Sequence, residues 1–341
     1  MTIAVRSFAK INLGLYIGAP RADGFHDLRT VYQTIALHDV IRVGVSRGKG
    51  IEIVCKCDDP RVPLDSSNTC YRIAALVMKE LGASGKVTIE IEKRLPVQGG
   101  MGAASSNAVA TMSALERALG LHSRSAGAGR RSQLRLYTDA QRLRIAAQVG
   151  SDLPLFVIGG TVLGVGRGEE VYPLPDLPSI PMVIVTPEIG VSTPRAFADW
   201  DALVQKDELT HSSSSDRLFE VGCALSAWLA ESSRNTGAPA KVGSRAGSLL
   251  SDLVRTGIEN DFERVVFPQS PELRDIKRAL ERAGAGYASL SGSGSTLYGL
   301  FRSAAEAVAA AGRLRKQGLK AVATRTLTRR GYGSQLLVGR R

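Results

Sequence analysis

The chain has 341 residues, 44% of them hydrophobic, and carries a formal net charge of +12. These values exclude a disordered or fibrous protein and predict a globular one with room for two domains, because a single core seldom grows beyond about 250–300 residues. The sequence has no apolar run of the roughly 18 residues that a membrane helix needs, and its start lacks the apolar core of a signal peptide. We expect a cytoplasmic protein without a membrane partner, either a monomer or a homodimer.

The positive charge is concentrated in two runs. Six arginines accompany one aspartate between residues 122 and 144, and nine lysines and arginines occur without an acid between residues 313 and 341. Neither run interleaves aromatic residues at a stacking spacing, so a solvated surface is favoured over a nucleic-acid site. A substrate that carries several phosphates would also suit a basic protein. The four cysteines lack the spacing of a metal site, and we expect ordinary thiols.

The first half predicts both strands and helices. Residues 3–17 alternate in polarity and predict a strand with Lys10, Asn12 and Gly14 on one face. An Asp-Gly turn within residues 21–27 leads into further strand-like sequence up to residue 45. We also expect a helix at 68–81, a strand at 87–93, a helix at 108–120, a basic insertion without chemistry at 123–132, and a helix at 139–149 capped by Thr138.

A proline-rich piece at 173–181 marks the expected boundary between domains 1–175 and 176–341. The second half predicts antiparallel strands with helices on one face, which is an α+β arrangement. Its expected strands are 182–186, 287–290, 296–301 and 320–326, and its expected helices lie near 212–232, 244–255, 271–283 and 304–317. A second glycine-rich loop, residues 291–295, joins two of these strands.

The stretch from Leu95 to Ala108 has the composition of a phosphate-binding loop. Gly99, Gly100 and Gly102 precede small alanines, two serines and a helix-forming segment. The first backbone N–H groups of a helix lack intrahelical partners, the helix dipole favours an anion, and small side chains let a polyphosphate approach closely. An ordinary glycine-rich turn capped by a serine explains this stretch equally well on its own. The usual P-loop and protein-kinase motifs are absent.

Other segments give this loop a context. Three of them resemble, in order, the three motifs of the GHMP small-molecule kinase superfamily: residues 9–13, 96–107 and 290–294. The resemblance narrows to the branch acting on 4-diphosphocytidyl-2-C-methyl-D-erythritol through residues 9–13, 21–26, 93–96, 150–154 and 259–263. It implies an N-terminal domain like that of ribosomal protein S5 and a ferredoxin-like C-terminal domain. The implied reaction is ATP-dependent phosphorylation of the 2-hydroxyl of that substrate, a step in the non-mevalonate route to isoprenoid precursors.

The resemblance also implies roles for individual residues. Lys10 and Asp152 would be catalytic, with Asp152 taking the proton of the acceptor hydroxyl. ATP is expected on Pro96, Gly99, Gly100, Gly102, Ala103, Ser105 and Ser106, and Ser106 is also the expected contact of Mg²⁺. The substrate is expected on Asn12, Phe25, His26, Tyr32, Thr193 and Phe197, with Arg167 as a further candidate for its phosphates. In that family the position of His26 pairs with the cytosine edge and its neighbour stacks on the ring.

Two other functions stay open on the sequence alone. A kinase for another small alcohol, such as mevalonate or homoserine, would share the superfamily motifs, although residues 23–26 favour a substrate with cytosine. An RNA-binding protein could use the S5-like fold together with the two basic runs. Without the resemblance, a strand lysine such as Lys10 is usually a surface residue, and an aspartate such as Asp152 is usually a turn former.

Overall fold

The computed structural model describes residues 2–97, 99–125, 137–206, 223 and 258–339. The strands of its first sheet follow the order β3, β4, β2, β5, β6, and β1 pairs with β2. Neighbouring strands are antiparallel except β3 and β4, which are parallel. The strands are β1 (Thr2–Pro20), β2 (His26–Ser46), β3 (Ile51–Cys57), β4 (Gly85–Glu92), β5 (Thr161–Val165) and β6 (Glu170–Pro173).

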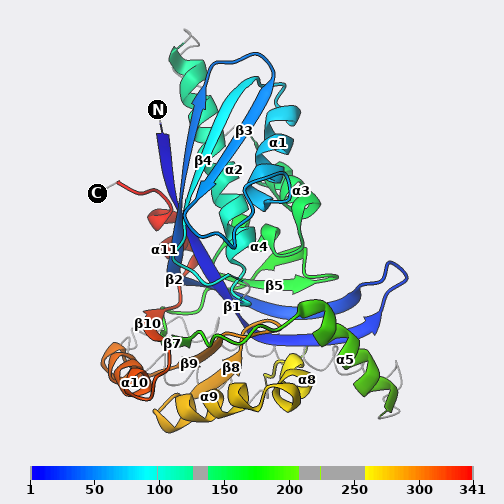
Figure 1. Cartoon of the computed structure of the whole chain (residues 1–341), viewed down its shortest axis with the longest axis vertical. Coiled ribbons are helices and arrows are strands. Elements are labelled where there is room, and N and C mark those ends of the chain that lie inside the picture. Colours follow the sequence, from blue (N-terminus) through cyan, green and yellow to red (C-terminus); the bar gives the residue numbers. More distant parts are fainter. Residues whose placement is uncertain (1, 98, 126–136, 207–222, 224–257, 340–341) are drawn as a thin grey trace.

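Helices pack against this sheet and bury its apolar face (Figure 1). They are α1 (Thr69–Glu80), α2 (Ala103–Ser125), α3 (Asp139–Val149) and α4 (Leu153–Ile158). Local signals start two of them. Asn68 accepts a hydrogen bond from the backbone N–H of Cys70 at the start of α1, and Thr138 forms a capping box with Gln141 at the start of α3.

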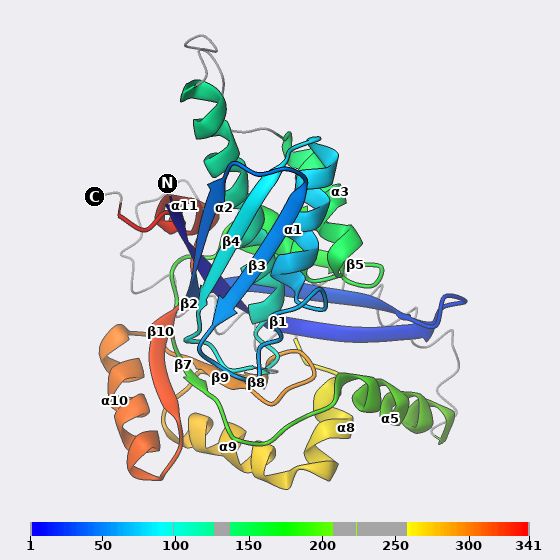
Figure 2. The same ribbon diagram turned by 45° about the horizontal axis from the view of Figure 1, so that its top comes forward.

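The second sheet is entirely antiparallel, with the order β10, β7, β9, β8. Its strands are β7 (Pro181–Val185), β8 (Tyr287–Leu290), β9 (Leu297–Leu300) and β10 (Ala321–Arg325). Helices α9 and α10 cover one face, and α8 continues this layer (Figure 2). The helices of this half are α5 (Thr193–Lys206), α8 (Phe262–Gln269), α9 (Pro271–Arg282) and α10 (Ala304–Lys316).

The two sheets share a core along β1 and β2. Ala9, Ile11 and Leu13 of β1 pack with Ile184 of β7 and with Tyr298 of β9. The polar side chains that alternate with them along β1 therefore face the other way. The turn between β1 and β2 lies next to α5 in both views (Figures 1 and 2). The β1–β2 hairpin therefore places one face of β1 between the first and the second half of the chain.

The end of the described chain returns to the first sheet. After β10, helix α11 (Arg329–Gln335) packs near β1, and the guanidinium of Arg6 donates to the carbonyls of Gln335 and Leu337 at 2.8 and 3.1 Å. The hydroxyl of Tyr332 donates to the carbonyl of Phe156 at 2.6 Å. Residues beyond the second sheet therefore complete the packing of the first.

The structure confirms the α+β class and the antiparallel second sheet with helices on one face. Helix α2 begins at Ala103 rather than near residue 108, because Gly102 has a φ of +65° and no helix can extend back through it. Strands β3, β5 and β6 and helices α4, α5, α8 and α11 were not predicted from the sequence. The expected helices near 212–232 and 244–255 fall outside the described residues but for position 223. The expected insertion at 123–132 begins inside α2, and its remaining residues also lie outside the described part of the chain. The expected boundary at 175 stays a prediction.

None of the helices in the described ranges is long and apolar enough to cross a membrane.

Candidate functional site

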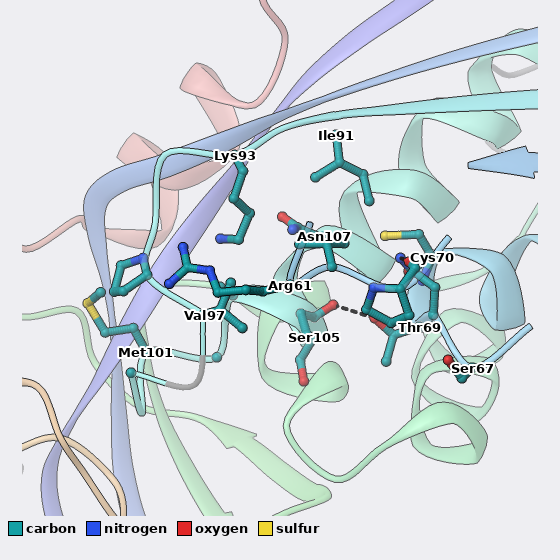
Figure 3. Close-up of a pocket in the computed structure, with 18 of the residues that line it drawn as sticks. Arg61, Ser67, Thr69, Cys70, Ile91, Lys93, Val97, Met101, Ser105 and Asn107 are labelled. Carbon is teal, nitrogen blue, oxygen red and sulfur yellow. Dashed lines mark hydrogen bonds between the residues drawn. The ribbon is translucent and has the colours of Figure 1, made fainter. Parts of the chain in front are cut away.

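Two cavities meet at the glycine-rich loop of residues 99–102. The first, here called the loop cavity, measures about 310 Å³ and lies between this loop and the starts of α1 and α2 (Figure 3). The predicted ATP residues that line it are Pro96, Gly99, Gly100, Gly102, Ala103 and Ser105. Segments from three parts of the chain therefore enclose the predicted phosphate loop.

The second cavity, here called the hairpin cavity, also measures about 310 Å³ and lies along the β1–β2 hairpin. The structure brings together in its lining Lys10, Asn12, Phe25, His26, Tyr32, Asp152, Arg167, Thr193 and Phe197. All were predicted as catalytic or substrate residues. Gly100 and Gly102 line both cavities, so the two cavities adjoin at these glycines.

A Cβ atom would clash at Gly100 and would be crowded at Gly102. Gly100 has a φ of +74°, and a Cβ atom there would lie 2.2 Å from the carbonyl oxygen of Ser291 in the second glycine loop. A Cβ atom at Gly102 would lie 3.0 Å from the ring of Phe156 and 3.1 Å from Cγ of Lys10. The loop is therefore pressed between the second half of the chain and Lys10, with its backbone exposed to both cavities.

The two predicted hydroxyls of the loop have different surroundings. Ser105 lines the loop cavity, whereas Ser106 is 2% exposed and its hydroxyl accepts a hydrogen bond from Ser7 at 2.7 Å. Both lie in the first turn of α2, where backbone N–H groups favour an anion. Within the described ranges, no three His, Cys, Asp or Glu side chains gather as a metal site of protein ligands would need. The expected Mg²⁺ contact of Ser106 stays a prediction.

Two buried polar atoms near the loop have no partner. They are Oδ1 of Asn107 and Oγ1 of Thr296, two of the three such side-chain atoms among the described residues. The amide of Asn107 donates to the buried Asp39 at 3.0 Å, and this fixes its orientation, because the flipped amide would set its oxygen against a carboxylate. Asn107 lines the loop cavity, and Oγ1 of Thr296 lies 3.0 Å from where a Cβ of Gly99 would stand. Unpartnered buried polar atoms fit a site that a polar ligand completes.

Lys10 and Asp152 face each other in the hairpin cavity. Nζ of Lys10 lies 3.6 Å from Oδ2 of Asp152 and donates to Oδ1 of Asn12 at 2.8 Å. The hydroxyl of Tyr32 donates to Oδ1 of Asp152 at 3.1 Å. Burial, and then the charge of Asp152, raises the pKa of Tyr32 well above its usual value, so this hydroxyl stays a donor. The carboxylate is held by a cation on one side and a phenol on the other.

The far end of the hairpin cavity is aromatic. The ring of His26 stacks on Phe197 of α5 with centroids 4.9 Å apart and planes at 15°. Phe25 is 49% exposed, and the guanidinium of Arg167 lies over its ring at 4.9 Å. Nε2 of His26 lies 2.7 Å from a carboxylate oxygen of Asp201, which is not among the residues predicted from the sequence. An aromatic slot with one polar edge suits a flat heterocycle.

Comparison with known proteins decides the family. Residues 68–160 match the GHMP kinases N terminal domain, and residues 242–320 match the description GHMP kinases C terminal. The 4-diphosphocytidyl-2-C-methyl-D-erythritol kinase of Solibacter usitatus is 36% identical over 87% of this chain and 81% of its own length. The relative with the same name from Heliobacterium modesticaldum is 34% identical over 91% of this chain and 89% of its own length. The chain belongs to the 4-diphosphocytidyl-2-C-methyl-D-erythritol kinase family.

Solved structures agree with this family. A 4-(cytidine 5'-diphospho)-2C-methyl-D-erythritol kinase is 26% identical, with a TM-score of 0.64 over 95% of this chain and 99% of that one. A homoserine kinase from Cytophaga hutchinsonii has a TM-score of 0.66 at 19% identity over 96% of this chain and 95% of that one, which shows the shared fold alone. The predicted GHMP kinase fold is confirmed. The protein is an ATP-dependent small-molecule kinase, as expected, rather than the RNA-binding alternative.

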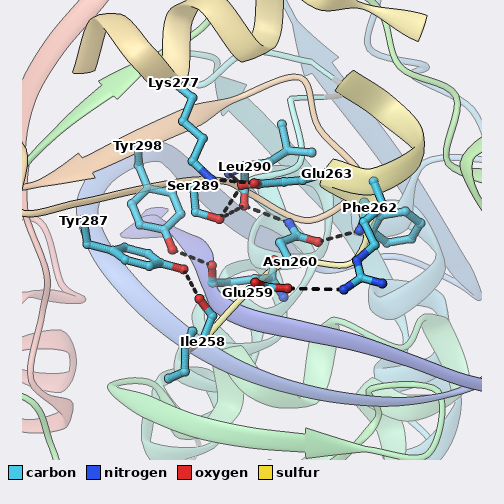
Figure 4. Close-up of polar contacts among 12 residues, drawn as sticks. Ile258, Glu259, Asn260, Phe262, Glu263, Lys277, Tyr287, Ser289, Leu290 and Tyr298 are labelled. Atoms are coloured by element: carbon cyan, nitrogen blue, oxygen red, sulfur yellow. Dashed lines mark hydrogen bonds and ion pairs between the residues drawn. The ribbon is translucent and has the colours of Figure 1, made fainter. Parts of the chain in front are cut away.

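Two residues of the segment 259–263, which resembles this kinase family, hold the second glycine loop in place (Figure 4). The side-chain amide of Asn260 donates to the carbonyls of Leu290 and Gly292 at 2.9 and 2.8 Å. Glu263 accepts from the backbone N–H of Leu290 at 2.9 Å and pairs with Lys277 at 2.6 Å. Asn260 therefore braces the second glycine loop from outside that loop. Its role as a brace could not be read from the chain, because its partners lie about thirty residues further on.

Replacing Asn260 with alanine should loosen the second glycine loop in this kinase. Two buried carbonyls lose their donor, which should lower the free energy of unfolding by about 1–3 kcal/mol and raise the KM of the phosphoryl acceptor. Denaturant unfolding and steady-state kinetics measure the two effects. Gln269→Ala is the matched control, since Gln269 bonds Asp199 at the surface and its loss should change stability by less than about 0.5 kcal/mol. Equal losses in both variants would contradict the bracing role.

Proposed function

We propose that the protein transfers the γ-phosphoryl group of ATP to the 2-hydroxyl of 4-diphosphocytidyl-2-C-methyl-D-erythritol. The observation that carries this proposal is the meeting of the two cavities at Gly100 and Gly102, beside Lys10. Phosphoryl transfer needs a donor and an acceptor held in line and a site that neutralises charge. A nucleotide in the loop cavity and a sugar alcohol in the hairpin cavity would have this relation.

The loop cavity would hold ATP. Backbone N–H groups of residues 99–105, at the start of α2, would bind its phosphates. The unpartnered Oδ1 of Asn107 supplies an acceptor for a donor group of the nucleotide. We expect Mg²⁺ to arrive on the phosphates of ATP, because magnesium keeps several waters and needs few protein ligands. The contact expected from Ser106 would use the second lone pair of its hydroxyl oxygen, because the first already accepts from Ser7.

The hairpin cavity would hold the acceptor. Asp152 would take the proton of the acceptor hydroxyl. The hydroxyl oxygen would at the same time bond to the γ-phosphorus, and ADP would leave. Lys10, 3.6 Å from Asp152, would stabilise the negative charge that develops during phosphoryl transfer. Tyr32 keeps the carboxylate oriented through its hydrogen bond, and Asn12 would orient the sugar alcohol.

The far end of the hairpin cavity would bind the cytidine diphosphate. Phe25 and Phe197 supply aromatic faces for the base, and His26 supplies a polar edge. Thr193, whose hydroxyl lies 2.7 Å from that of Ser293, and Arg167 are candidates for the substrate phosphates.

A coupled assay of ADP release tests this function. The purified protein should release ADP with 4-diphosphocytidyl-2-C-methyl-D-erythritol and should not respond to mevalonate or homoserine, because neither would fill the aromatic end of the cavity. A mass increase of one phosphoryl group on the cytidine substrate completes the test. Turnover with mevalonate or homoserine instead would overturn the proposal.

A further inference from the structure

Two residues of α5 hold the imidazole of His26 in a defined way. Phe197 stacks on the ring, and Asp201, one helical turn later, lies 2.7 Å from Nε2. Residues four apart on a helix share a face, so a single face of α5 fixes both the plane of the ring and its Nε2 edge. His26 lines the hairpin cavity and is 8% exposed. With Nε2 turned to Asp201, Nδ1 is the ring nitrogen left for a ligand.

We propose that Asp201 is a positioning residue that sets the tautomer of His26 and so makes the site select cytosine over uracil. An ionised carboxylate can only accept hydrogen bonds, so the neutral imidazole must carry its proton on Nε2. Nδ1 is then an acceptor. This inference rests on the proposed function, which places the base beside His26.

The two pyrimidines differ at the edge that this acceptor would read. Cytosine carries an amino donor at position 4, whereas uracil carries a carbonyl oxygen there. The amino group of cytosine can donate a hydrogen bond to Nδ1. The carbonyl oxygen of uracil cannot, because both it and Nδ1 are acceptors, and His26 is largely buried. A site built to bond one group rejects an analogue that cannot make the bond, because buried polar atoms are left unpaired.

The first test compares the cytidine substrate with its uridine analogue. The wild-type enzyme should prefer the cytidine compound by about 10- to 100-fold in kcat/KM. In Asp201→Asn the amide can either accept from Nε2 or donate to it, so both tautomers become available and Nδ1 is a donor in part of the molecules. The preference should fall about tenfold or more, through KM rather than kcat, while the KM of ATP stays constant. Asp201→Glu keeps an acceptor and should retain the preference for cytidine.

Asp199→Asn is the matched control. Asp199 lies on the same helix but bonds Gln269 rather than His26, so this variant should keep the wild-type preference. An equal loss with both substrates in Asp201→Asn, or no change in preference, would overturn the tautomer role. If the wild-type enzyme phosphorylates neither compound, the proposed function itself fails. If the wild type prefers cytidine and Asp201→Asn preserves that preference, only the role of Asp201 fails.

Nitrogen NMR of the imidazole gives a readout that does not depend on turnover. The chain has four histidines, and the loss of one signal in His26→Gln identifies His26. At about pH 8, above the ordinary titration range of imidazole, the wild type should show protonated Nε2 and bare Nδ1. Asp201→Asn should move part of the signal to the other tautomer. A wild-type spectrum with the proton on Nδ1 would overturn the proposal even where a variant folds poorly.

Discussion

Asp152→Asn should lower kcat by roughly 100- to 10,000-fold while the Kd of ATP stays within a few-fold. Asparagine keeps the size of the side chain and can still accept from Tyr32, but it cannot take the proton of the acceptor hydroxyl. It also removes the negative partner of Lys10, 3.6 Å away. Single-turnover kinetics with saturating substrates measure the chemical step, and calorimetric titration of ATP measures binding.

The control for this variant is Asp275→Asn on α9. Asp275 pairs only weakly with Arg278 at the surface, 3.8 Å away, so its loss should leave kcat unchanged. Retained turnover in Asp152→Asn would remove Asp152 as the base. A matched loss of ATP affinity would instead indicate that the carboxylate organises the loop cavity.

Gly100→Ala should weaken ATP binding at least about tenfold and lower the free energy of unfolding by roughly 2–4 kcal/mol. The new Cβ would lie 2.2 Å from the carbonyl oxygen of Ser291 and 2.8 Å from that of Gly294, so one glycine loop must move away from the other. The φ of +74° adds strain of about 1–2 kcal/mol for any residue with a Cβ. Calorimetric titration and denaturant unfolding measure the two losses.

Gly318→Ala is the control that separates the two effects in Gly100→Ala, the strain of a positive φ and the close contact of the new Cβ. Gly318 has a φ of +84°, but a Cβ there would meet no atom within 4 Å. This variant should lose only the part of stability that comes from the backbone angle and should bind ATP normally. If Gly100→Ala behaved in the same way, the close contact between the two glycine loops would have no part in holding the nucleotide.

Local patterns in the sequence predicted much of this fold. The alternation along β1 placed Lys10 and Asn12 on one face, and both line the hairpin cavity. The capping signal at Thr138 predicted the start of α3 correctly. β3 was not predicted, since its pairing with β4 is parallel and spans the intervening helix α1. The start of α2 was set too late, because the short run of alanines and serines before residue 108 suits a loop as well as a helix.

The candidate site depended on resemblance rather than on pattern. Tyr32 and Asp152 are 120 positions apart, and nothing in either local sequence says that they meet. Asp201 was missed for the same reason, since its partner His26 is 175 positions away and α5 itself was not predicted. Packing in the core that the two sheets share brings such distant residues together. Short-range periodicity carries no information about that packing.

The return of the chain to β1 has a consequence for synthesis. The backbone N–H of Arg6 donates to the carbonyl of Leu336 at 2.7 Å, and that of Val338 donates to Ala4 at 3.1 Å. β1 emerges from the ribosome before the other described strands, yet this part of its edge stays unpaired until synthesis has passed Val338. Closing so long a loop is slow, and an open strand edge is a template for other nascent chains. Until residues 336–338 have been made, this part of the β1 edge can pair with the strands of other chains.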